Sequence, residues 1–91
     1  MKNNLITEIQ IIPVKPHDGL VAFASFVYDN ALYVASVGIY TRPTGGFRLT
    51  YPTRKSAAAS IPLFHPINKD VAAIIEDAVI SKYEAIMADD R

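Results

Sequence analysis

The sequence contains no cysteine and no tryptophan among its 91 residues. A chain without cysteine forms no disulfide, which is compatible with the reducing cytoplasm. Uncharged stretches near its start, such as residues 19–28, are far shorter than the roughly 20 apolar residues that cross a bilayer. No hydrophobic run precedes Glu8, so a secretory signal is not expected. We therefore expect a cytoplasmic protein without a membrane segment.

Patterns typical of catalysis or cofactor binding are also missing. The sequence has no glycine-rich phosphate loop, and no nucleophile elbow surrounds any serine. Its two histidines, His17 and His65, lie too far apart in sequence to suggest a metal site. Glu76 and Asp77 are neighbours on an expected helix and point about 100° apart, which suits paired carboxylate chemistry poorly. We expect no enzyme activity, no metal and no cofactor.

What the sequence does have is apolar residues, which make up 51% of the chain. The length fits one domain, residues 1–91. A domain of this size has little interior, since it buries only roughly 60–65% of the surface of its unfolded chain. The apolar excess therefore predicts that one face meets a second copy of the chain, as a homodimer.

Four segments are rich in β-branched and aromatic residues: 5–14, 20–28, 32–41 and 47–51. Alternation in the first places Leu5, Thr7, Ile9 and Ile11 on one face, and Pro13 and Pro16 should end it. Turn residues separate the segments: 16–19, Asp29-Asn30, and 43–46. We expect an antiparallel meander of four to five strands, with residues 52–64 an irregular connection that holds a short strand near 61–64.

A single amphipathic helix should close the chain. Asn68 is a good N-cap, and His65 before Pro66 favours an extended approach to it. His65 is expected to fix the start of the helix, with direct ligand contact the less favoured alternative. The apolar positions recur at helical spacing: Val71, Ile74, Ile75, Ala78, Val79, Tyr83 and Ile86. Residues 88–91 should fray, and the fold class is α+β.

The charges cancel overall but are unevenly distributed. Nine basic residues balance nine acidic ones, yet no acidic residue lies between Asp29 and Asp70. That interval carries five basic residues: Arg42, Arg48, Arg54, Lys55 and Lys69. Residues 70–91 carry six acidic residues and two basic ones. A basic segment without carboxylates is the electrostatic pattern expected for a phosphate backbone, although a solvated basic loop would look the same.

Three blocks of sequence resemble the stage V sporulation protein G (SpoVG, septation regulator) family. They are Val-Ala-Phe-Ala-Ser at 21–25, Tyr-Pro-Thr-Arg-Lys at 51–55, and His-Pro-Ile-Asn at 65–68, which opens a helix containing Asp-Ala-Val-Ile at 77–80. The resemblance covers about residues 5–87. It implies a small cytoplasmic homodimer that regulates bacterial septation, sporulation and transcription by binding DNA, and also RNA, without enzyme activity.

The resemblance places the nucleic-acid contacts at the basic pair Arg54 and Lys55, on a mobile loop after the fourth strand. Thr53 and Ser56 are additional phosphate donors, and Arg42 and Arg48 extend the basic surface. Three positions depart from the family pattern: Ser36 and Gly38 replace an acidic and a basic residue in the third strand, and Ala72 replaces a basic residue in the helix. The alternative function is a dimeric protein–protein interaction module that does not bind nucleic acid.

Overall fold

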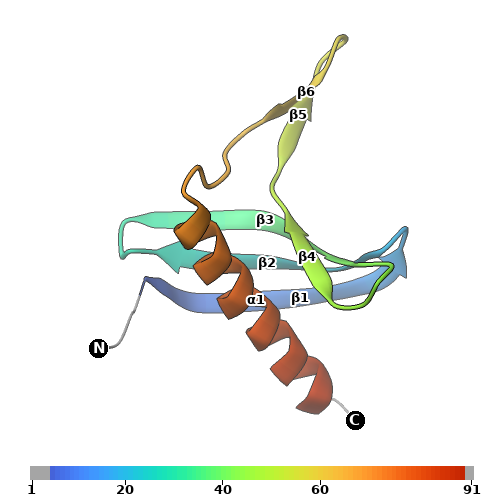
Figure 1. Ribbon diagram of the computed structural model, residues 1–91, viewed down its shortest axis with the longest axis vertical. Coiled ribbons are helices and arrows are strands. Elements are labelled where there is room, and N and C mark those ends of the chain that lie inside the picture. The colour runs from blue at the N-terminus through green and yellow to red at the C-terminus, as the bar shows by residue number, and fades with distance from the viewer. Residues whose placement is uncertain (1–4, 90–91) are drawn as a thin grey trace.

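The computed structural model describes residues 5–89, which form a four-stranded sheet, a projecting hairpin and one helix (Figure 1). Strands β1 (Ile6–His17), β2 (Leu20–Tyr28), β3 (Leu32–Thr41) and β4 (Phe47–Thr50) lie antiparallel in sequence order. Strands β5 (Thr53–Lys55) and β6 (Ser60–Pro62) pair in a separate sheet, and α1 (Lys69–Asp89) follows. The α+β class and the meander with a C-terminal helix are confirmed.

Strand β1 differs from the expectation in two ways. It runs through Pro13 and Pro16 to His17, because β1 is an edge strand and proline is tolerated there. Glu8 has a positive φ of 52°, and the pairing with β2 shifts register between Thr7 and Gln10. This bulge places Ile6 with Ile9 and Ile11 against the core. The predicted face is therefore confirmed for Ile9 and Ile11 and wrong at the start of the strand, where Ile6 packs against the core in place of Leu5 and Thr7.

The turn between β2 and β3 forms where the sequence predicts it. Asp29 and Asn30 both adopt positive φ, 52° and 53°, which these two residue types tolerate. Ala31 N donates to Tyr28 O at 2.8 Å and closes the turn. The bounds of β2 and β3 match the prediction, and β4 ends at Thr50, one residue early.

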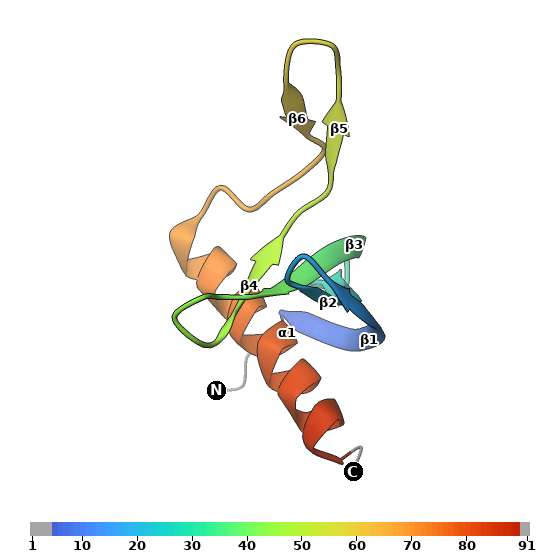
Figure 2. The ribbon, with the colours of Figure 1, turned by 90° about the vertical axis from the view of Figure 1, so that its right-hand side faces the viewer.

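The core lies between one face of the sheet and α1, which crosses the strands diagonally (Figures 1 and 2). Ala22 and Ala24 on the central strand β2 are buried, and their small side chains leave room for the helix. The remaining core residues are larger: Phe26, Val37, Ile39, Ile75, Val79 and Tyr83. Phe47 meets Tyr83 edge to face with ring centroids 5.1 Å apart. The expected apolar stripe of the helix is thus its buried face.

The C-terminal helix is longer than expected. Ala88 and Asp89 remain helical, although the sequence assigned residues 88–91 to a frayed tail. Asp90 and Arg91 lie outside the described residues. No helix in residues 5–89 has the length and apolar content needed to span a membrane.

The sheet face opposite the helix is partly apolar. Ile12 and Phe23 are opposite each other in the β1–β2 pairing and are 61% and 39% exposed. Residues directly opposite in an antiparallel pair share a face, so these two side chains lie together. A second copy as the cover of this face stays a prediction.

Candidate nucleic-acid interface

The segment that follows β4 is a closed hairpin, not the irregular connection that the sequence suggested. The short strand expected near 61–64 overlaps β6, which lies slightly earlier, at Ser60–Pro62. At its base, Leu63 N donates to Pro52 O at 3.0 Å. At its tip, Ser56 N donates to Ala59 O at 2.9 Å. The hairpin stands away from both sheet and helix (Figures 1 and 2). We call β5, β6 and the turn between them, residues 53–62, the arm.

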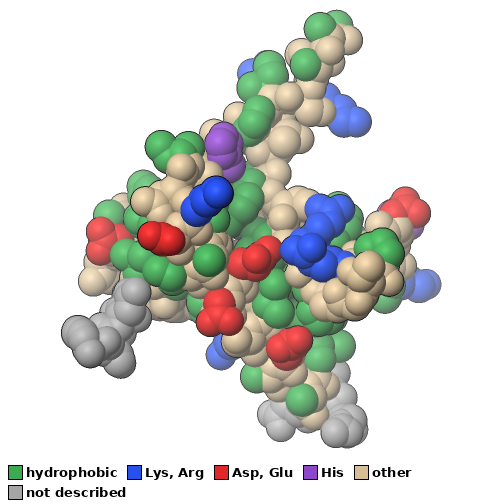
Figure 3. Space-filling view, viewed as in Figure 1, with side chains coloured by type: hydrophobic (Ala, Val, Ile, Leu, Met, Phe, Trp, Pro, Cys, Tyr) green, Lys and Arg blue, Asp and Glu red, His purple; other side chains and the backbone are tan. Residues whose placement is uncertain are grey.

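Arg54 and Lys55 lie on strand β5 of the arm and not on a loop after a strand. Both side chains are exposed. Arg54 is opposite Ile61, and Lys55 is opposite Ser60. Because successive side chains of a strand point to opposite faces, the two cations project from opposite faces of the arm. Figure 3 shows basic side chains on both sides of it.

The two hydroxyl residues of the arm differ in what they offer a phosphate. Thr53 is exposed and is opposite Pro62, so it shares a face with Lys55. The Ser56 hydroxyl donates to Ala59 O at 3.1 Å and accepts from Ala59 N at 3.3 Å. These bonds hold Ser56 in the turn, so Thr53 is the better phosphate donor of the two.

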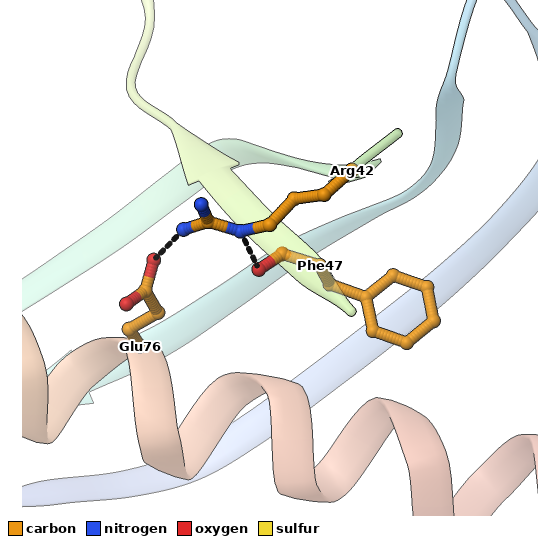
Figure 4. A network of polar contacts seen from close by, with 3 residues as sticks. All are labelled: Arg42, Phe47 and Glu76. Atoms are coloured by element: carbon orange, nitrogen blue, oxygen red, sulfur yellow. Dashed lines mark hydrogen bonds and ion pairs between the residues drawn. The ribbon is translucent and has the colours of Figure 1, made fainter. Parts of the chain in front are cut away.

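Arg42 is tied to the body of the protein rather than to the arm. Its Nε donates to Phe47 O at 3.0 Å, and its Nη2 lies 4.0 Å from Glu76 Oε2 on the helix (Figure 4). The nearby carboxylate offsets part of the guanidinium charge. Arg42 therefore connects the β3–β4 turn to α1 and presents a weaker attraction to phosphate than an unpaired cation would.

Arg48 lies on β4, opposite Tyr40 of β3, and its guanidinium carbon is 5.0 Å from the Tyr40 ring centroid. This cation–π geometry holds the charge over the sheet. Arg54 follows Arg48 by six positions in the chain, which corresponds to about 20 Å when the chain is extended. The five site residues thus form two groups: Thr53, Arg54 and Lys55 on the arm, and Arg42 and Arg48 beside β4.

The residues before the helix form its cap. Asn68 Oδ1 accepts a hydrogen bond from Val71 N at 3.0 Å, the geometry of an N-cap. His65 is exposed, with its Nδ1 3.1 Å from Pro66 O. A carbonyl oxygen only accepts, so the contact is a hydrogen bond in the forms of the ring that carry a proton on Nδ1.

Each of the three departures from the family pattern has a structural setting. Ser36 adopts a positive φ of 64° at a second bulge, where the register of β2 and β3 shifts. Gly38 is crowded, because a Cβ there would lie 2.8 Å from Thr50 Oγ1. Ala72 lines a shallow hollow together with Lys69 and Glu76. Lys69 thus supplies a basic side chain in the hollow that Ala72 lines.

Sequence reasoning missed an aromatic contact at the base of the arm. The rings of Tyr51 and Phe64 meet edge to face, 6.3 Å apart, just before β5 and just after β6. Burial, and secondarily the charge of Glu76, raise the pKa of Tyr51 to about 12. Its hydroxyl therefore stays protonated at neutral pH. No group of three potential metal ligands occurs within residues 5–89.

The fold and site together define a small α+β protein whose antiparallel sheet carries a projecting, doubly basic hairpin. A family model described as SpoVG matches residues 4–85, and the chain belongs to this family. The basic arm therefore lies within the matched region.

Sequence similarity to curated relatives extends over most of the chain. A Caldicellulosiruptor saccharolyticus protein is 29% identical over 91% of this chain and 94% of its own length. A Bdellovibrio bacteriovorus protein is 30% identical over 87% of this chain and 72% of its own length. An Archaeoglobus fulgidus protein is 29% identical over 87% of this chain and 93% of its own length. All three are named as septation proteins of the SpoVG type, and these names describe no enzyme.

Proposed function

We propose that this chain is a non-enzymatic, cytoplasmic regulator that binds nucleic acid, DNA and also RNA, through its arm. The observation that carries the proposal is the placement of Arg54 and Lys55 on opposite faces of a projecting hairpin. Neither forms an ion pair within residues 5–89, unlike Arg42 with Glu76. The nearest acidic residues in sequence are Asp29 and Asp70, so no carboxylate of the arm repels phosphate.

The chemistry of the two cations differs. A guanidinium forms two parallel hydrogen bonds to a phosphate, and an ammonium acts as a point charge. Thr53 adds a neutral donor on the face of Lys55. These contacts are to the backbone of the nucleic acid, so they give affinity with little sequence preference.

A charge-matched pair of variants tests the proposal. Binding of duplex and single-stranded DNA and of RNA is measured by gel shift at two salt concentrations. The double variant Arg54→Ala/Lys55→Ala should weaken binding to all of them, and should reduce the slope of log K against log salt by about one per lost contact. The control Lys15→Ala/Lys82→Ala removes two exposed cations from the body and should change binding far less.

Equal effects of the two double variants would show that the arm has no special role. Absence of any shift at low salt would reject nucleic-acid binding altogether. That result would favour the alternative, a protein-interaction module, for which Ile67 and Leu63, 92% and 58% exposed, offer apolar contacts.

We also propose that two copies associate through the sheet face that carries Ile12 and Phe23. A two-fold interface would place two arms on one particle and double the cationic surface. Phe23→Asp should convert the dimer to a monomer in sedimentation, whereas Lys15→Asp, an exposed charge change elsewhere on β1, should not. A wild-type protein that sediments as a monomer at all concentrations would reject this interface.

A further inference from the structure

An apolar hollow of about 440 Å³ lies at the base of the arm, and it plays no part in the function proposed above. Its walls come from the ends of β2 and β3, the chain before β5, the chain after β6 and the first turns of α1. Six aromatic rings line it: Phe26, Tyr28, Tyr33, Tyr51, Phe64 and His65. A volume in this range suits a small, flat ligand.

The polar groups of the hollow suit a heterocycle. Among residues 5–89, its lining contains no acidic residue and includes three tyrosines, Tyr28, Tyr33 and Tyr51, whose side chains combine an aromatic face with a hydroxyl. Asn68 Oδ1 is occupied by Val71 N, which leaves the amide NH2 group as a donor. His65 also lines the hollow, and the tautomer that donates from Nδ1 to Pro66 O has Nε2 as an acceptor. Stacking faces with a few donors and acceptors are what an unpaired nucleobase needs.

The hollow and the cations of the arm are close along the chain. Tyr51 precedes Arg54 by three residues, about 10 Å of extended backbone. Phe64 follows β6 by two residues, and its ring contacts Tyr51 across the base of the arm. A strand of nucleic acid whose phosphates follow Arg54 and Lys55 would therefore carry a base past Tyr51 and Phe64.

We propose that the hollow receives an unpaired base of single-stranded nucleic acid, stacked against Phe64 and its aromatic neighbours. The inference rests on the nucleic-acid binding proposed above, and it specifies single strands with unpaired bases as the preferred ligand. Base–aromatic stacking is sequence-tolerant and contributes severalfold to a hundredfold in affinity for each base.

A second copy is the other occupant to consider, and the charges disfavour it. An arm from a second copy that entered the hollow would bring its own Arg54 and Lys55 toward the basic arm of the first copy. Like charges brought together in a partly desolvated site repel. A polyanion carries the opposite charge and gains from the same cations.

The experiment compares a short oligothymidylate with an abasic strand of the same phosphate count and with the matching duplex. The chain has no tryptophan, and three of its five tyrosines line the hollow, so tyrosine fluorescence responds to a ligand bound there. The oligothymidylate should quench this emission and bind about tenfold more tightly than the abasic strand. Phe64→Leu should bind the oligothymidylate and the abasic strand equally well, with an unchanged slope of log K against log salt. Phe64→Trp should retain the tighter binding of the oligothymidylate.

Leu63→Ala is the matched control, because Leu63 is an exposed neighbour that does not line the hollow. It should leave the preference for bases intact. Tyr33→Ala offers a second test if Phe64→Leu does not fold, since Tyr33 is 70% exposed and lines the hollow.

The possible failures are distinguishable. Equal affinity for the oligothymidylate and the abasic strand, with both lost in Arg54→Ala/Lys55→Ala, would overturn the base site and keep the arm as a phosphate site. Absence of binding to every strand would overturn the proposed function itself. If Phe64→Leu instead dissociates a dimer in sedimentation, without altering any preference for bases, a second copy occupies the hollow.

Discussion

Tyr51 and Phe64 contact each other edge to face, with ring centroids 6.3 Å apart, and so join the two segments of chain that lead into and out of the arm. The arm itself is three residue pairs long. Isolated two-stranded hairpins are marginally stable in water, so such a contact at the base helps to hold the strands together. The same two rings line the hollow below Arg54 and Lys55, so one contact supports both the basic arm and the proposed base site.

Asn68→Ala should lower the free energy of unfolding by about 1 kcal/mol, because Val71 N loses its side-chain acceptor. In a domain of this size the melting temperature should then fall by roughly 4–8 °C. Thermal unfolding followed by circular dichroism measures the change. Asn68→Asp is the matched control and should retain most of the stability, since aspartate caps equally well and suits the helix dipole. Equal losses in both variants would contradict the capping role.

Gly38→Ala should destabilise the protein, because its Cβ would lie 2.8 Å from Thr50 Oγ1 and 3.0 Å from a Tyr40 ring carbon. Overpacking of this kind costs about 1–3 kcal/mol. Adding Thr50→Ala should recover part of the loss, which a double-mutant cycle in urea would detect as coupling between the two positions. Additive effects would contradict the clash.

The crowding at Gly38 bears on its departure from the family pattern. A lysine there would meet the same contacts as alanine, so Gly38→Lys should be at least as destabilising. Ala72→Lys adds the same charge in the hollow that Lys69 and Glu76 line, and should change stability by no more than about 0.5 kcal/mol. Chemical unfolding of the two lysine variants compares the positions directly.

Tyr51 should give the protein a specific sensitivity to alkali. Its pKa in the folded state is about 12, above the ordinary value of 10.0, chiefly because of burial and secondarily because of Glu76. The unfolded state therefore releases this proton first as pH rises. The stability contributed by the protonated phenol is complete below pH 10 and is lost between pH 10 and 12.

Tyr51→Phe should remove this part of the pH dependence. The measurement is the urea midpoint of wild type and variant across that range, and the difference between them should change with pH only above 10. Glu76→Gln is the companion variant and should lower the pKa of Tyr51, which the absorbance of phenolate follows. A constant difference between wild type and Tyr51→Phe at all pH values would contradict the assignment.

Local chemistry was sufficient to predict β2, β3, the Asp29-Asn30 turn and the start of the helix. Each depends on residues close in sequence, such as the positive φ that asparagine tolerates. Of the arm, only a short strand near 61–64 was predicted, which overlaps β6. Its pairing with β5 was missed because residues 53–62 lack both a strong apolar alternation and a glycine turn, and Ser56 supplies the turn bonds instead. The pairing of Arg42 with Glu76 depends on how the helix packs, which no local pattern contains.

The candidate site shows the same division. The sequence identified Arg54 and Lys55 as an adjacent basic pair. Only their position on strand β5 shows that the two side chains project from opposite faces of the arm. In the sequence, Arg42 and Arg48 belong with this pair only because they share its charge. In the fold, Arg42 donates a hydrogen bond to Phe47 O of β4 and Arg48 lies on β4 over the Tyr40 ring, so both lie at the main sheet and not on the arm. The aromatic hollow is assembled from β2, β3, the base of the arm and the helix, so its rings are scattered through the sequence.

The bulge at Glu8 gives the last prediction. A left-handed conformation costs a residue with a side chain about 1–2 kcal/mol, and Glu8 has a φ of 52°. Glycine adopts this φ freely, so Glu8→Gly should preserve or raise the free energy of unfolding, although part of the gain is lost to the entropy of the unfolded chain. Glu8→Val should lower it, because a β-branched residue is strained at positive φ.

If β1 had no bulge at Glu8, Glu8→Val would be more stable than Glu8→Gly, since valine favours regular strands and glycine weakens them. Urea unfolding of the two variants therefore distinguishes the register in which Ile6 packs with Ile9 and Ile11 from the simple alternation that the sequence suggests. Gln10→Gly and Gln10→Val are the matched controls, because Gln10 is exposed on the same strand without positive φ. There valine should be the more stable of the two variants.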